Sequence, residues 1–173
     1  MADTTISSEL RERIRAALKA NPRAMLMMVA AEMGVPEAEV VRSLPDNQSC
    51  ELDIGRWEEL IRSFEALDKV HVICSNGAVT LEAFGQFGNF STSGTFFNVQ
   101  TASIDMHIRY KNLGAAFAVE KPGHMDGFKT ISFLFFDKNG QSAFKVFLSF
   151  GAKAPTPERE AQFNAIREKF RLK

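Results

Sequence analysis

Histidine is the residue type with which this chain could bind a metal ion, and it is scarce. Only three histidines occur among 173 residues. One of them, His107, lies in the segment 102–110, where apolar and polar residues alternate. The alternation predicts a β-strand whose polar face carries His107 and Arg109, roughly 6 to 7 Å apart. The imidazole could therefore bind a metal ion while the guanidinium pairs with a carboxylate of the same ligand.

Haem offers that combination, because it carries an iron and propionate groups. A second interpretation of the same strand remains open. Asp105, His107 and Arg109 also fit a solvated ladder of charges on the open face of a one-sided antiparallel sheet. The spacing by itself does not distinguish a ligand site from such a ladder.

The remaining candidate ligands are few. Tyr110 is the only tyrosine and ends the same predicted strand. His124 and Met125 lie in the segment 121–127, where a proline and two glycines predict a turn. A loop histidine beside a methionine could supply a second axial ligand, although an exposed turn histidine without a role fits the same sequence. His71 opens an earlier predicted strand, and we assign it no role.

Motifs for other chemistries are missing from the sequence. It contains no glycine-rich phosphate loop, no nucleophile elbow and no HExxH motif. Cys50 and Cys74 are isolated, without metal-ligand or haem-attachment spacing, so we expect two reduced cysteines with a structural role. The sequence therefore favours a binding protein over an enzyme.

Composition limits the partners and the compartment. Twenty-one basic residues balance twenty-one acidic ones, so the net charge gives no general attraction to nucleic acid or to an anionic membrane. The first residues lack the apolar core of a signal peptide, and no run of eighteen apolar residues follows. We therefore expect a cytoplasmic protein without a nucleic-acid or membrane partner.

The first third of the chain predicts helices. Apolar residues recur at helical spacing, and Ser7, Gly34 and Pro36 are residues typical of helix ends. The four predicted helices span residues 8–20, 24–33, 36–44 and 55–67. A fifth, starting after Thr156 and carrying Phe163, Ile166 and Phe170 on its apolar face, is expected to pack on a sheet.

After residue 67 the pattern changes to the alternation of strands. Asn76-Gly77 predicts a tight hairpin turn. The segment 84–94, rich in glycine, serine and phenylalanine, is expected to be a mobile loop. The predicted strands span residues 69–75, 79–84, 102–110, 115–120, 129–136 and 142–150. Their short connections predict an antiparallel sheet.

The fold class that follows is α+β. We expect an all-helical N-terminal third, an antiparallel sheet of about six or more strands, and a C-terminal helix packed on that sheet. The corresponding division is a helical subdomain of residues 1–68 and a sheet region of residues 69–173, which together form one domain at this chain length.

The segment 30–40 also has the spacing of a helix-turn-helix, which raises the alternative of a DNA-binding regulator. The second helix of that motif begins with Pro36, Glu37 and Glu39 and offers only Arg42 as a cation. Contacts to bases and phosphates require basic or amide side chains at such positions. We therefore expect a packing role for this segment.

Several motifs together resemble one protein family. They are Phe96-Phe97-Asn98, then Ile104-Asp105-Met106-His107-Ile108-Arg109, then Phe135-Phe136-Asp137 with Gly140, and then Phe144-Lys145-Val146-Phe147-Leu148. In this order they resemble the HutX/ChuX family of intracellular haem-utilisation proteins. The likeness covers most of the chain, including its helical first third.

The resemblance implies a haem carrier that forms a homodimer, whose paired sheets look like the two halves of the related HemS/ChuS haem proteins. It implies that His107 is an axial ligand of the haem iron and that Arg109 pairs with a propionate. Haem would be bound as cargo and passed to a haem-accepting or haem-degrading protein. A haem-degrading enzyme that uses the same histidine stays open as an alternative.

Overall fold

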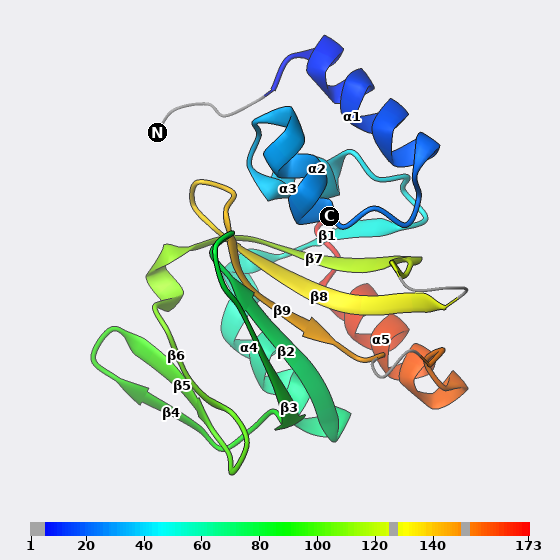
Figure 1. Ribbon diagram of the computed structural model, residues 1–173. Coiled ribbons are helices and arrows are strands. Elements are labelled where there is room, and N and C mark those ends of the chain that lie inside the picture. Colours follow the sequence, from blue (N-terminus) through cyan, green and yellow to red (C-terminus); the bar gives the residue numbers. More distant parts are fainter. Residues whose placement is uncertain (1–5, 125–127, 150–152) are drawn as a thin grey trace.

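A computed structural model describes residues 6–124, 128–149 and 153–173 of the chain (Figure 1). Its centre is a six-stranded sheet in which every neighbouring pair is antiparallel. In spatial order the strands are Ser49–Leu52 (β1), Leu113–Pro122 (β7), Lys129–Asp137 (β8), Ser142–Phe147 (β9), Lys69–Ser75 (β2) and Thr80–Gln86 (β3). A separate three-stranded sheet contains Phe90–Ser93 (β4), Phe96–Gln100 (β5) and Asp105–Ile108 (β6).

The helices begin and end where the sequence predicts, within a few residues. They are Ser8–Ala20 (α1), Leu26–Met33 (α2), Glu37–Arg42 (α3), Trp57–Arg62 (α4) and Pro157–Phe170 (α5), with 3₁₀ helices Ile54–Arg56 (η1), Ser63–Leu67 (η2) and Tyr110–Asn112 (η3). The side chains of Ser7 and Thr156 accept hydrogen bonds from the first turns of α1 and α5. Gly34 ends α2 in the left-handed conformation.

Helices cover the main sheet on both faces over β7 and β8. On one face, α1, α2 and α3 pack against alternate residues of the two strands, among them Phe117 and Leu134. On the other face, α4, η2 and α5 pack against the intervening residues, and the ring of Phe133 lies 5.2 Å from that of Phe163 in α5. This explains why the strand at residues 129–136 is apolar on both faces, and it confirms the packing of the C-terminal helix on the sheet.

The three-stranded sheet is held to the main body by side chains of α4. The ring of Trp57 lies 4.7 Å from that of Tyr110 in a stacked arrangement and 5.3 Å from that of Phe97 in an edge contact. The Arg62 guanidinium lies over the rings of Phe90 and Phe97. In Figure 1 this small sheet extends away from the helices α1 to α3. The contacts with α4 bury one face of the small sheet and leave its other face open.

The prediction of an all-helical N-terminal third is wrong. Strand β1 begins at Ser49 and pairs with β7 from Ser49 opposite Val119 to Leu52 opposite Ala116. Four residues between the turn at 46–48 and η1 give too little alternation to be distinguished from a loop, and only the pairing with a distant strand makes them a strand. The division into residues 1–68 and 69–173 stays a prediction.

Two other expectations need correction. The segment 84–94, expected to be a loop, contains the end of β3 and all of β4, and its Phe87 is buried. The glycines of this segment interrupt the alternation of apolar and polar residues by which a strand is predicted. The strand expected at 102–110 is shorter, because β6 spans only Asp105–Ile108 and η3 follows. The hairpin turn at Asn76-Gly77 is confirmed, with Gly77 at a φ of 87°.

Candidate functional site

The open face of the small sheet carries the predicted polar row. Pairing places Asn98 of β5 opposite Ser91 on one side and opposite His107 on the other. Ile108 is buried while Asp105 and His107 are exposed, so the predicted alternation of faces along β6 is confirmed. The register therefore brings polar side chains from all three strands together on one surface.

His107 makes two polar contacts on this surface. Its Nδ1 lies 2.8 Å from Oδ1 of Asn98, and its Nε2 lies 3.6 Å from Oδ1 of Asp105. The side chain of His107 is 56% exposed, and that of Asp105 is exposed as well. Nδ1 is thus held by Asn98, while more than half of the imidazole side chain is open to solvent. This arrangement is typical of a histidine that ligates a metal.

Arg109 lies on the same surface, with Phe96 beside it. The guanidinium carbon of Arg109 lies 5.6 Å from the centre of the Phe96 ring, and the imidazole of His107 meets that ring edge-on at 6.3 Å. Phe96 is 37% exposed. An apolar ring between an imidazole and a guanidinium could contact a flat aromatic ligand whose metal and carboxylates reach the two polar groups.

Sequence reasoning assigned no role to Phe96 or Asn98. The signal was present in Phe96–Gln100, where Phe96, Asn98 and Gln100 alternate with Phe97 and Val99 of the core. Assigning them to the face of His107 requires the pairing of β5 with β6. Alternation within one strand does not give that register.

Tyr110 is not part of this surface. It begins η3, is partly buried against the main core, and stacks on Trp57. The predicted ligand set is therefore divided, with His107 and Arg109 together and the tyrosine ring used in packing. Tyr110 helps to fix the end of β6 from which Arg109 projects, which is a supporting position.

The second predicted ligand pair lies elsewhere. His124 is exposed in the connection between β7 and β8, and Met125 lies outside the described residues. In Figure 1 the end of β7 and the start of β8 lie at the far end of the main sheet from the small sheet that carries β6. Within one chain, the structure does not bring His124 to His107.

His71 lies on the main sheet, apart from the small one. Its ring stacks on Phe84 at 4.1 Å, and its Nε2 lies 2.8 Å from Oε2 of Glu82. Burial lowers the pKa of His71, while Glu82 acts in the opposite direction. Its aromatic contact and its carboxylate partner explain this histidine without a ligand.

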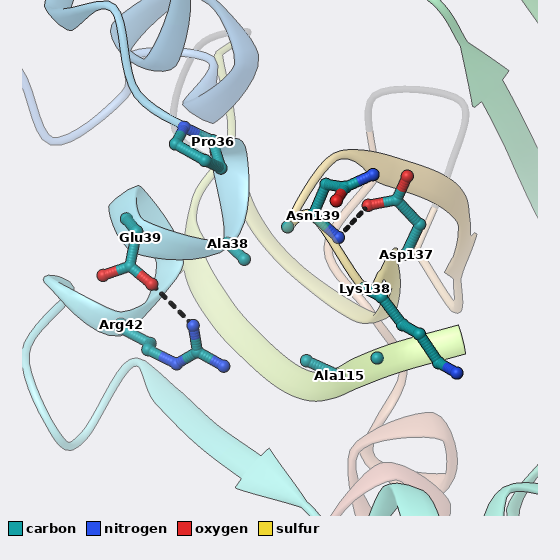
Figure 2. Close-up of a pocket in the computed structure, with 10 residues that line it drawn as sticks. Pro36, Ala38, Glu39, Arg42, Ala115, Asp137, Lys138 and Asn139 are labelled. Atoms are coloured by element: carbon teal, nitrogen blue, oxygen red, sulfur yellow. Dashed lines mark hydrogen bonds and ion pairs between the residues drawn. The ribbon is translucent and has the colours of Figure 1, made fainter. Parts of the chain in front are cut away.

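Two cavities lie away from His107. One, of about 130 Å³, is bounded by α3 and by the turn between β8 and β9; Figure 2 shows Glu39 bonded to Arg42 on one side and Asp137 bonded to Asn139 on the other. The other, of about 230 Å³, lies between β1 and α5 and includes Cys50. Among the charged side chains drawn in Figure 2, Glu39 and Arg42 are bonded to each other and Asp137 is bonded to the backbone of Asn139.

Two features are absent from residues 6–124, 128–149 and 153–173, which the structure describes. No group of three or more histidine, cysteine, aspartate or glutamate side chains gathers there as a metal site. No helix in those ranges has the length and apolar character needed to cross a membrane.

The chain is similar to one family of known proteins and to several solved structures. A family model described as haem utilisation ChuX/HutX matches residues 50–166. The intracellular heme transport protein HutX of Vibrio cholerae is 22% identical over 162 residues, covering 92% of this chain and 83% of that protein. A solved structure of the heme binding protein ChuX is 24% identical, with a TM-score of 0.79 over 90% of this chain and 97% of that chain.

A longer solved protein has a similar fold over part of its length. Holo-PhuS, a heme-binding protein from Pseudomonas aeruginosa, matches 95% of this chain with a TM-score of 0.78 and 22% identity. The match covers 46% of the PhuS chain. One copy of the present fold therefore corresponds to about half of that protein.

Proposed function

Because the chain belongs to the haem utilisation ChuX/HutX family, we propose that it is a cytoplasmic carrier that binds haem and holds it without turnover. The observation that carries the proposal is the exposed imidazole of His107, one nitrogen of which is held by Asn98. The names of HutX and ChuX as heme transport and heme binding proteins support the same cargo.

Three side chains of the small sheet have the chemistry for haem. Nε2 of His107 is the proposed axial ligand of the iron. The exposed guanidinium of Arg109 is the proposed partner of a propionate, because guanidinium and carboxylate form charge-assisted hydrogen bonds. Phe96, between the two, offers an apolar ring to the porphyrin. Tyr110 supports this surface through its stack on Trp57.

We also propose that the carrier is a homodimer. PhuS is about twice as long as the part that this chain matches, so two copies of the present fold would supply a comparable amount of structure. His124 and Met125 remain proposed second ligands only in that setting, where another copy could bring its β7–β8 connection to His107. A haem-accepting or haem-degrading protein is the proposed recipient of the cargo.

The test is a titration of the purified protein with hemin, followed by Soret absorbance, for the parent and for His107→Ala and His124→Ala. We expect saturation near one haem per chain and loss of the ligand-dependent Soret shift in His107→Ala. Sedimentation of the same samples gives the mass of the assembly. If the parent shows no saturable shift, the proposal fails, and a shift lost only in His124→Ala moves the ligand to the β7–β8 connection.

The DNA-binding alternative is disfavoured by the packing of α3. Every residue of this helix except Arg42 is buried, and Glu37 pairs with Lys145 of β9 at 2.5 Å. Arg42 itself is bonded to Glu39 and Glu51. A recognition helix needs a free face with unpaired basic or amide groups, and α3 presents its charged groups to its own protein.

A further inference from the structure

The polar side chains around His107 form a connected series of hydrogen bonds across the small sheet. Nδ2 of Asn98 donates to Oγ of Ser91 at 3.0 Å, and that hydroxyl donates to Oε1 of Gln100 at 3.3 Å. Nε2 of Gln100 lies 3.5 Å from Oδ1 of Asp105. The series begins at the imidazole of His107, whose Nδ1 contacts Oδ1 of Asn98.

The direction of these bonds follows from the chemistry of their members. An ionised carboxylate only accepts, so Asp105 turns the NH₂ group of Gln100 toward itself and leaves Oε1 to accept from Ser91. A hydroxyl has one hydrogen, so Ser91 can only accept from Asn98. The amide oxygen of Asn98 is then the atom that faces His107, and it has to accept a hydrogen from Nδ1.

From this series we infer that Asn98 is a positioning residue that fixes the tautomer of His107. It holds the hydrogen of the neutral imidazole on Nδ1 and leaves the lone pair on Nε2 for the metal. The inference rests on the proposed function, because the lone pair matters only if Nε2 ligates iron. Second-shell partners of this kind set both the orientation and the basicity of a ligating imidazole.

Asn98 is the buried member of the series, and burial restricts the rotation of its amide group. Asn98 is 6% exposed, although it lies on the open face of the sheet, whereas Ser91 and Gln100 are exposed. A buried amide that lost either partner would leave a donor or an acceptor unsatisfied. Rotation of the Asn98 amide is therefore opposed at both ends, by Ser91 and by His107.

The other tautomer of His107, with its hydrogen on Nε2, also has a hydrogen-bond acceptor nearby, namely Asp105. Its carboxylate lies 3.6 Å from Nε2 of His107, so a hydrogen on Nε2 would point toward an acceptor. If Asn98 did not hold the hydrogen on Nδ1, Asp105 would favour it on Nε2. The two side chains thus favour opposite tautomers, and only the one favoured by Asn98 keeps Nε2 available.

The first measurement is the tautomer of His107 in the haem-free protein, from ¹⁵N chemical shifts of histidine-labelled samples at a pH where the ring is neutral. The spectrum contains only three histidines, and His107→Gln assigns the signal. We expect a pyrrole-type shift for Nδ1 and a pyridine-type shift for Nε2. The opposite pattern in the parent would overturn the inference.

Three variants separate positioning from folding. Asn98→Leu removes the acceptor and should move the hydrogen to Nε2, while Asn98→Asp keeps an acceptor and should retain it on Nδ1. Ser91→Ala frees the amide without touching His107 and should give a mixture of tautomers. Thr92→Ala is the matched control, because Thr92 is exposed on the same strand and pairs with Phe97. An unchanged tautomer in both Asn98→Leu and Ser91→Ala would contradict the inference.

Hemin titrations of the same proteins link the tautomer to the function. We expect Asn98→Leu to lose about tenfold to a hundredfold in hemin affinity. Asn98→Asp should stay close to the parent. If hemin binds the parent and Asn98→Leu equally, this inference fails while the proposed function stands. If hemin binds none of the proteins, the proposed function fails and the inference falls with it, whatever the tautomer.

Discussion

Arg109 is exposed on the proposed haem surface without a carboxylate partner among the residues that the structure describes. Its guanidinium has the ring of Phe96 as a neighbour, which orients it without neutralising its charge. Most other arginines here contact a glutamate, as Arg42, Arg56 and Arg62 do. Arg109 can therefore bind an anion without breaking an ion pair.

This predicts a selective effect of Arg109→Ala. A hydrogen bond to a charged group contributes roughly 1.5 to 3 kcal/mol, so hemin affinity should fall by about tenfold to a hundredfold. The Soret position should stay the same, because the iron ligand is untouched. Affinity for the dimethyl ester of hemin, which lacks carboxylates, should not change. Lys111→Ala is the control, since Lys111 is an exposed cation two residues away. Equal losses for hemin and its ester would contradict a propionate contact.

The buried side chain of Lys121 leads to a prediction about how the stability of the fold depends on pH. Burial lowers the pKa of Lys121 to about 8, and its Nζ donates to the carbonyl of Pro122 at 2.7 Å. The unfolded chain therefore binds more protons than the folded one between pH 8 and the ordinary lysine pKa near 10.4. Stability should rise with pH through that window and be lowest, on this account, below pH 8.

The measurement is urea denaturation of the parent and Lys121→Met at a series of pH values. The parent should gain on the order of 2 to 3 kcal/mol relative to the variant between about pH 8 and pH 10. Other groups titrate in this range in both proteins, so only the difference is informative. Lys111→Met is the exposed control and should follow the parent. A constant difference across the window would show that Lys121 titrates normally.

At the scale of elements, the turn between β8 and β9 is joined closely to α3. Gly140 has a φ of 75°, and its carbonyl accepts a hydrogen bond from the backbone of Ala38 at 3.1 Å. A Cβ at this position would lie 2.9 Å from Cβ of Pro36. Gly77 has a similar φ of 87°, but no atom would lie within 4 Å of its Cβ.

Substitution of the two glycines by alanine therefore separates the cost of backbone strain from the cost of steric crowding. Gly77→Ala should cost about 1 kcal/mol of unfolding free energy from the left-handed backbone alone. Gly140→Ala should cost roughly 1 to 3 kcal/mol more, because the rigid ring of Pro36 has to move. Chemical denaturation of the two variants under one condition measures both. Equal losses of unfolding free energy in the two variants would mean that α3 moves away from the turn at little cost.

The elements also show which parts of the fold a sequence can predict. Strands β2, β8 and β9 were predicted because each carries its own alternation or apolar run between clear turn residues. β1, β4 and β5 were missed. β1 and β4 have only four residues each; β1 becomes a strand by pairing with the distant β7, whereas β4 and β5 form a hairpin around Gly94. The helical ends were predicted from local capping, which needs no tertiary contact.

Some residues of the candidate site could likewise be predicted from the sequence, and others could not. The common face of His107 and Arg109 follows from the two-residue period of a single strand. Asn98, Phe96 and Ser91 join that face through the register between strands, which the sequence does not specify on its own. The expected membership in the ChuX/HutX family is confirmed by the match over residues 50–166.

At the scale of the whole molecule, the open position of His107, the proposed iron ligand, favours carrying haem over degrading it. An enzyme that activates oxygen on iron encloses it to exclude water and to orient the oxygen. His107 instead lies on the open face of the small sheet, whose other face packs on Trp57 and Arg62 of α4. A second copy could cover the haem, but the described residues around His107 provide one potential ligand and no enclosing element of their own chain.

We therefore predict that haem bound to this protein stays intact under reducing conditions. Hemin-loaded protein should be supplied with ascorbate and oxygen, with catalase present to remove peroxide, while the Soret band is followed. The band should shift on reduction and persist, and an apoprotein with higher haem affinity should then withdraw the haem unchanged. His107→Ala, loaded to the same occupancy, is the control for unspecific oxidation. Loss of the Soret band with formation of an open-chain tetrapyrrole in the parent, but not in His107→Ala, would make the protein a haem-degrading enzyme.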